Sequence, residues 1–166
     1  MQAKHIIWKG NDMNLEILYK QFSGNDSFKT PEDRKSVYLE SLEKMYPGIL
    51  CSIGQCMEVK LTGEPYEDEG FYTTEMRKSD YPWWIVTTSV GNEGAIALFY
   101  PGAMERLALI LGESYYVGCA GDDRAILIGE SFMPLERFQN LCQKKYQSKG
   151  YFYNAETEIF SLAQGN

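Results

Sequence analysis

Residues 114–130, SYYVGCAGDDRAILIGE, decide the fold. The two ends of this stretch are apolar and rich in aromatic and β-branched residues, which favour strands. The four residues between them, AGDD at 120–123, are typical of a tight turn, because glycine and aspartate adopt the backbone angles that such turns require. The stretch therefore predicts a β-hairpin, and we expect the sheet around it to be antiparallel.

Three helices are expected around this hairpin, each with apolar residues repeated every three or four positions along one face. The first, at about 31–46, follows a threonine that can cap it and begins with a proline. The second, at about 102–111, stops at Gly112, which is placed to adopt a left-handed conformation. The third begins at Pro134.

Further apolar runs predict the rest of the sheet. Residues 49–60 predict a strand, with a turn near Gly54. Residues 83–89 and 95–100 are separated by turn residues, and together they predict a second antiparallel hairpin. The aromatic and apolar residues within 151–162 predict a final strand or hairpin.

Length and composition agree with a single domain. The chain has 166 residues, 44% of them hydrophobic, with 12 Tyr, 8 Phe and 3 Trp, which is enough for one core. We therefore expect an α+β domain over 1–166, with a mainly antiparallel sheet and about three helices packed on it. No apolar run reaches the roughly 18 residues of a membrane span, and the N-terminus has no leader pattern, so we expect a cytoplasmic protein.

Motifs for catalysis, metals and cofactors are missing from the sequence. With His5 as its one histidine, the chain lacks the partners for histidine-dependent triads and for zinc sites. The cysteines are expected to be reduced, and Cys119, in a predicted strand, to be a buried, inert thiol. No glycine-rich phosphate loop occurs. We expect no cofactor, no metal ion and no enzymatic activity.

The charge is unevenly distributed along the chain. The net charge is −7, and residues 51–100 hold eight acids and three bases. Because an acidic protein repels phosphate backbones, direct binding of nucleic acid is not expected. Lys144, Lys145 and Lys149 are expected near the C-terminal end of a helix, where the helix dipole favours cations.

A long acidic segment at 62–81 combines carboxylates with aromatic rings and shows no clear period, apart from a short strand expected near 71–75. It has three interpretations: a solvated acidic loop, a weak calcium site without EF-hand spacing, or an interface with a basic partner. In the strand that follows, the adjacent Trp83 and Trp84 are expected to point to opposite faces. We predict the interface, with these partner-binding residues: Glu64, Tyr66, Glu67, Asp68, Glu69, Tyr72 and Trp83.

Two short motifs occur twice. Tyr-Pro-Gly lies at 46–48 and 100–102, and Gly-Glu-Ser lies at 112–114 and 129–131. The prolines and glycines of the first motif stand where one element gives way to another, so we predict turns there and not a chemical site. Each copy of the second motif is expected to end an element.

Five stretches of the C-terminal half carry a resemblance to a known family: NEGAIALFYPG, AMERLALILG, SYYVGCAG, RAILIGE and YFYNAETEIF. From about Trp84 to Leu162 the chain resembles uncharacterised domains of gut Firmicutes and their mobile elements. Members of that family have Pro-Ser-Ser and His-Glu residues between two central strands, where this chain has GCAGDDRA, so no role of those residues transfers. The resemblance implies an α+β fold in a bacterial or mobile-element setting, and it implies no activity.

Three classes of function follow. We expect a non-catalytic, acidic binding protein that inhibits a nucleic-acid enzyme, as anti-defence and anti-CRISPR proteins do. Its partner would be a protein with a basic surface, whose phosphate-binding groove the carboxylates occupy. One alternative is a structural or self-assembling module, which would form a stable homo-oligomer. The other is a small enzyme that uses carboxylates, tyrosines or Cys119, which would show a cleft with two opposed acids.

Overall fold

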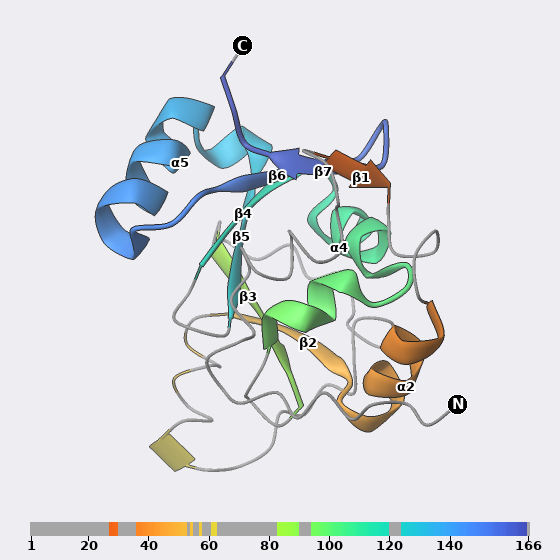
Figure 1. Ribbon diagram of the computed structural model, residues 1–166. Helices are drawn as coiled ribbons and strands as arrows, with labels where there is room; N and C mark the ends of the chain where they lie inside the picture. Colours follow the sequence, from red (N-terminus) through yellow and green to blue (C-terminus); the bar gives the residue numbers. More distant parts are fainter. Residues whose placement is uncertain are drawn as a thin grey trace.

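An antiparallel sheet of seven strands forms the centre of the described part of the computed structural model (Figure 1). The structure describes residues 27–29, 36–52, 54, 57, 61–62, 83–89, 94–119 and 124–165. The strand order across the sheet is β1-β7-β6-β4-β5-β3-β2. The strands are β1 (Ser27–Lys29), β2 (Gly48–Ser52), β3 (Trp83–Thr88), β4 (Tyr115–Cys119), β5 (Ala125–Gly129), β6 (Tyr151–Asn154) and β7 (Ile159–Leu162).

Both C-terminal hairpins are confirmed. Strands β4 and β5 pair antiparallel, with Tyr115 opposite Gly129, while their turn at 120–123 lies outside the described residues. Strands β6 and β7 also pair antiparallel, with Tyr151 opposite Leu162. Since β4 also pairs with β6, the two hairpins form one continuous block of four strands. The predicted antiparallel α+β fold is therefore correct.

The described helices match the predicted positions. Helix α2 covers Ser36–Met45, inside the expected 31–46, and residues 31–35 lie outside the described part of the chain. Helix α4 covers Ala103–Leu111 and ends at Gly112, whose φ of 77° is left-handed and whose N–H donates to the Ala108 carbonyl at 2.7 Å. Helix α5 (Leu135–Leu141) continues into a π-helical turn, η4 (Cys142–Tyr146).

The predicted hairpin of 83–89 with 95–100 is wrong. Residues Gly94–Phe99 form a 3-10 helix, η2, and β3 pairs instead with β2 and β5. All six residues of η2 are buried, so the run has no polar face, and an unbroken apolar run does not distinguish a strand from a buried helix. The strand predicted at 49–60 is also too long, because β2 ends at Ser52.

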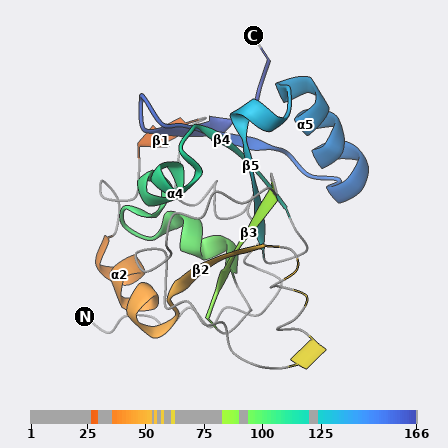
Figure 2. The same ribbon diagram turned by 180° about the vertical axis from the view of Figure 1, so that it is seen from behind.

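Successive side chains of β4, β5 and β6 alternate between two cores, so both faces of this part of the sheet are covered. In β4, Tyr115 and Val117 belong to the main core, which also contains residues of η2 and α4. Tyr116 belongs to a second core with Phe138 of α5, and the two rings stack with centroids 4.8 Å apart. Seen from both sides, α5 lies at the end of the sheet away from α2 (Figure 2).

Candidate functional site

Most of the predicted partner-binding residues lie outside the described part of the chain. This holds for Glu64, Tyr66, Glu67, Asp68, Glu69 and Tyr72, as well as for the strand expected near 71–75. Trp83 is described, and it opens β3 with a half-buried side chain. The predicted interface therefore stays a prediction.

The two adjacent tryptophans point to opposite faces of the sheet, as expected. Trp84 packs against the main core, whereas Trp83 packs against the second core beneath α5. Both side chains are half-buried. Trp83 therefore helps to hold α5 on the sheet, and only part of its surface is open to a partner.

The described cysteines do not favour nucleophilic chemistry. The Cys142 sulfur is enclosed by two glycines, since a Cβ at Gly118 or at Gly150 would lie 3.2 Å from it. Burial, and secondarily the nearby Cys119 thiol, raise the pKa of Cys142 to about 12, so it is a neutral thiol at physiological pH. Cys119, expected to be buried, is half-buried at the end of β4. Among the described residues no cluster of three His, Cys, Asp or Glu could hold a metal ion.

The described part of the molecule has as many basic as acidic side chains. The whole chain has 23 acids and 16 bases, so residues outside the described ranges carry the entire net charge of −7. Half of the described bases lie within 137–149, on α5 and just beyond it. Within the described residues the acids are Glu40, Glu43, Glu105, Glu113, Glu130, Glu136, Glu156 and Glu158, and the bases are Lys29, Lys44, Arg106, Arg124, Arg137, Lys144, Lys145 and Lys149.

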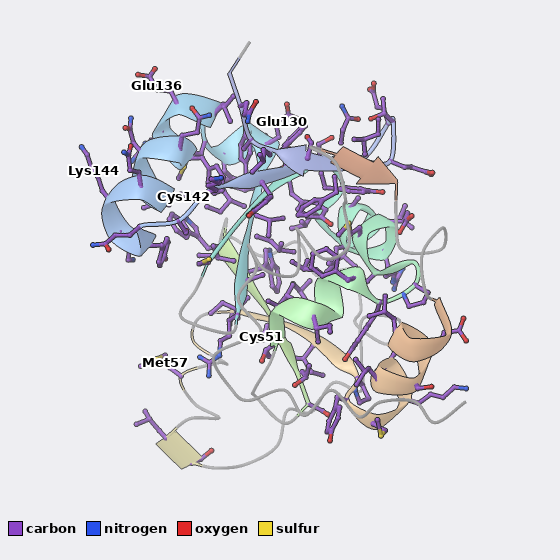
Figure 3. All side chains as sticks on the ribbon, viewed as in Figure 1. Cys51, Met57, Glu130, Glu136, Cys142 and Lys144 are labelled. Atoms are coloured by element: carbon purple, nitrogen blue, oxygen red, sulfur yellow. The ribbon has the colours of Figure 1, made fainter. Side chains whose placement is uncertain are left out.

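A pocket of about 470 Å³ lies between α5 with its π-helical turn and the segments that flank the last hairpin. We call it the α5 groove. The lining residues that come from α5 and η4 lie on one face of the helix. In Figure 3 the side chain of Glu136, one of these residues, points away from the sheet, whereas Cys142, which is not in the lining, points toward the sheet. The lining residues are Glu136, Gln139, Asn140, Gln143, Ser148, Lys149, Gly150, Leu162, Ala163 and Gln164.

Hydrogen bonds hold the walls of the groove together. The Gln139 side-chain amide donates to the Ala163 carbonyl at 2.6 Å, which ties α5 to the segment after β7. The Ala163 N–H donates to the Gly150 carbonyl at 3.0 Å, which ties that segment to the one before β6. A side chain at Gly150 would overlap the Phe138 ring, so only glycine allows this segment to approach α5.

At one end of the groove the backbone adopts uncommon conformations and one buried hydroxyl lacks a hydrogen-bond partner among the described residues. Helix α5 ends in a π-helical turn, a rare conformation that is frequent at functional sites. Gln147, which follows, has a φ of 49°, a left-handed conformation that is uncommon for residues other than glycine. The hydroxyl of Ser148 is buried, and it has no hydrogen-bond partner among the described residues. These three features adjoin one another in the chain.

Sequence reasoning missed the groove. Its carboxamides at 139, 140 and 143 recur with the spacing of one helix face, and this is the signal that could have marked it. The opposite wall comes from residues 148–150 and 162–164, whose approach depends on the pairing of β6 with β7. The predicted position of the lysines near the C-terminal end of a helix is confirmed for Lys144 and Lys145, which lie in the last turn of η4.

Comparisons with known proteins give no family for this chain. No family model, no curated protein and no solved structure matches it. The resemblance of residues 84–162 to a family of mobile-element domains therefore stays a prediction. None of the described helices is both long enough and apolar enough to cross a membrane.

Proposed function

We propose that the protein is a non-catalytic binding protein that engages a basic surface of a nucleic-acid enzyme and inhibits it. The observation that carries this proposal is the distribution of charge. The described residues contain equal numbers of acidic and basic side chains. The excess of acids therefore lies in the rest of the chain, which includes Glu64, Glu67, Asp68 and Glu69. A local excess of carboxylates is attracted to a basic groove more strongly than the same charge spread over the surface.

The chemistry of the described residues favours binding over catalysis. Cys142 is held protonated by burial, so it is a poor nucleophile. The described carboxylate Glu113 is engaged by Ser131, whose N–H and hydroxyl each donate to it at 2.8 Å. The thiol is packed in the second core, and the carboxylate is held by hydrogen bonds within the fold. A binding protein needs no reactive thiol or free carboxylate, so a binding role agrees with the state of both groups.

A nucleic-acid enzyme is the class of partner that the charge favours. Such an enzyme binds phosphates through lysine and arginine in a groove, and carboxylates on aromatic-rich protein surfaces can occupy the same groove. The rings among residues 62–83 supply the apolar contacts that anchor such an interface. An inhibitor of this kind competes with DNA or RNA, so added salt weakens both interactions.

The test compares two variants of equal net charge. The first replaces Glu64, Glu67, Asp68 and Glu69 by the corresponding amides, and the second replaces Glu40, Glu130, Glu156 and Glu158, all exposed on the described part, by glutamine. Each variant loses four negative charges. Both are assayed for inhibition of DNA or RNA cleavage by a panel of nucleases, RNA-guided ones included.

We expect the native protein and the second variant to inhibit at least one nuclease, and the first variant to lose inhibition by roughly tenfold or more, about 1.4 kcal/mol. Equal loss in both variants would show that only the total charge matters. Full inhibition by the first variant, or none by the native protein, would reject the proposal.

Self-assembly is a second candidate, favoured by one observation. The bases Arg137, Lys144, Lys145 and Lys149 are exposed on and beyond α5, so a second copy could receive the acidic segment of the first. Exposed apolar side chains on the described surface, Leu109 (61% exposed) and Phe132 (55% exposed), could add contact area. Light scattering at low and high salt distinguishes this candidate, because only self-assembly gives a salt-sensitive oligomer of the purified protein alone.

A further inference from the structure

The walls of the α5 groove are rich in side-chain amides. Gln139, Asn140 and Gln143 come from α5 and η4, and Gln164 comes from the segment after β7. Each carboxamide both donates and accepts hydrogen bonds in one plane, as a peptide group does. Gln139 uses its Nε2 to bind the Ala163 carbonyl, which leaves Oε1 as an acceptor. The groove therefore offers both hydrogen-bond donors and hydrogen-bond acceptors.

The spacing of these groups suits an extended chain. From Glu136 to Gln143 the helix rises by about 10 Å, at about 1.5 Å per residue. An extended peptide covers that length in about three residues, at about 3.3 Å each. Side chains one helical turn apart, about 5.4 Å, can thus meet main-chain groups of alternate peptide residues, about 6.6 Å apart, along the same edge of such a peptide.

The charge, residue types and volume of the groove limit the classes of ligand that it can bind. The lining contains one carboxylate, Glu136, and one ammonium group, Lys149, so it has no net charge. None of its ten residues is aromatic, so the groove lacks the stacking platform on which nucleic-acid bases are bound. Its volume of about 470 Å³ lies within the usual range for ligand sites, roughly 300–1,000 Å³.

The groove is open to solvent. Half of its lining residues are exposed, among them Asn140, Gln143 and Gln164, so a chain can enter it from the surface. At one end, the buried Ser148 hydroxyl lacks a partner, next to the left-handed Gln147. Local strain and unsatisfied groups of this kind cluster where proteins bind ligands.

From these observations we infer that the α5 groove binds an extended, uncharged segment of about three residues from a partner protein, through its main-chain groups. Asn140 and Gln143 hydrogen-bond the peptide backbone, and Leu162 and Ala163 contact one of its side chains. Rotation of Ser148 about χ1 gives its hydroxyl a partner on the peptide. This inference does not depend on the acidic segment or on the proposed inhibition.

The test is an NMR titration of the full chain with acetyl-trialanine N-methylamide, which carries main-chain groups and no charge. Unblocked trialanine and maltotriose are titrated in parallel, as models of a free peptide and of a sugar. We expect the blocked peptide to shift the side-chain amide signals of Asn140 and Gln143 and the backbone signals of Gly150 and Ala163. We expect the other two probes to shift them at least threefold less at equal concentration.

Variants provide the second readout. Asn140→Ala and Gln143→Ala, both at exposed positions, are each expected to weaken binding by roughly three- to tenfold, the effect of one or two lost hydrogen bonds. Lys144→Ala, on the same turn but outside the lining, serves as the matched control and should bind as the native protein does.

Three results would overturn the inference. One is an absence of shifts in the lining signals with the blocked peptide at about 20 mM, a concentration that detects millimolar binding. Another is stronger binding of maltotriose or of unblocked trialanine, which would assign the groove to a sugar or to a free peptide. The third is equal affinity of the blocked peptide for the Asn140→Ala, Gln143→Ala double variant and for Lys144→Ala.

Discussion

The hydroxyl of Tyr100 donates a hydrogen bond to the main-chain oxygen of Tyr46, with the two oxygens 2.9 Å apart. These residues begin the two Tyr-Pro-Gly motifs, which lie 54 positions apart in the chain. Beside them, the Ser89 N–H donates to the Pro47 carbonyl at 2.9 Å. The repeated motif therefore lies at junctions between elements, as predicted, and in addition one copy binds the other and connects the end of α2 to the start of α4.

Replacement of Tyr100 by phenylalanine tests this contact. Tyr100 is fully buried, so Tyr100→Phe keeps the ring packed and removes only the hydroxyl. We expect the free energy of unfolding to fall by about 1 kcal/mol, measured by denaturant titration. Tyr153→Phe is the control, because the Tyr153 hydroxyl is buried without a hydrogen-bond partner among the described residues, and we expect this variant to be neutral or more stable. A larger loss for Tyr153→Phe than for Tyr100→Phe would contradict this assignment.

The two Gly-Glu-Ser motifs are also joined. Glu113 of the first copy accepts hydrogen bonds from the N–H and the hydroxyl of Ser131 of the second, and the Glu130 N–H donates to the Ser114 carbonyl at 2.9 Å. In a double-mutant cycle of Glu113→Gln and Ser131→Ala we expect a coupling energy of about 0.5–1 kcal/mol, because the pair is exposed to solvent. Denaturant titrations of the four proteins measure it. A coupling of zero would show that the pair does not stabilise the fold.

Gly94 is expected to be intolerant of any side chain. A Cβ there would overlap the backbone of Thr87, where η2 crosses β3, and the backbone cannot move aside without disturbing the sheet. Gly94→Ala should lower the free energy of unfolding by about 2–3 kcal/mol or more. Gly165→Ala, with nothing within 4 Å, should leave stability within about 0.5 kcal/mol of the native protein. Thermal and denaturant unfolding of both variants would check this, and similar stabilities would refute the close approach.

Stability is expected to decrease at alkaline pH because of Cys142. In the unfolded chain this thiol ionises near its ordinary pKa of 9.0, whereas in the folded protein burial raises its pKa to about 12. The unfolded state therefore loses the proton first, so the stabilisation is fully present below pH 9 and is lost as the pH rises toward 12. Cys142→Ala should show a shallower decrease over that window in denaturant titrations, with Gly165→Ala, which changes no thiol, as the control. Parallel curves for Cys142→Ala and the native protein would exclude Cys142 as the cause.

The elements that the sequence predicted well are those with two independent signals. Helix α4 has both an apolar face and a terminal glycine, and the β4–β5 hairpin has strand-forming residues on both sides of turn residues. The segment 94–99 has only one signal, an unbroken apolar run, and this is where the prediction failed. Periodicity reports which residues are buried on one face, so it gives no information where every residue is buried.

The contacts between distant residues could not be predicted from one sequence. The α5 groove exists because Gln139 reaches Ala163 and because Gly150 can approach Phe138, and both contacts depend on the packing of α5 on the sheet. The predicted acidic interface is a different case. It depends on residues 62–81, which lie outside the described part of the chain, and their composition remains the basis for that prediction.

The position of β1 has a consequence for the order in which the molecule assembles. Ser27 of β1 pairs with Ser161 of β7, about 130 residues further along the chain, whereas β4–β5 and β6–β7 join near neighbours (Figure 1). Because closing a long loop costs more entropy than closing a short one, we expect the two hairpins to form early and β1 to dock last. Until then the outer edge of β7 has unpaired backbone groups. During synthesis this edge is the surface that a chaperone or a second unfinished chain would meet first.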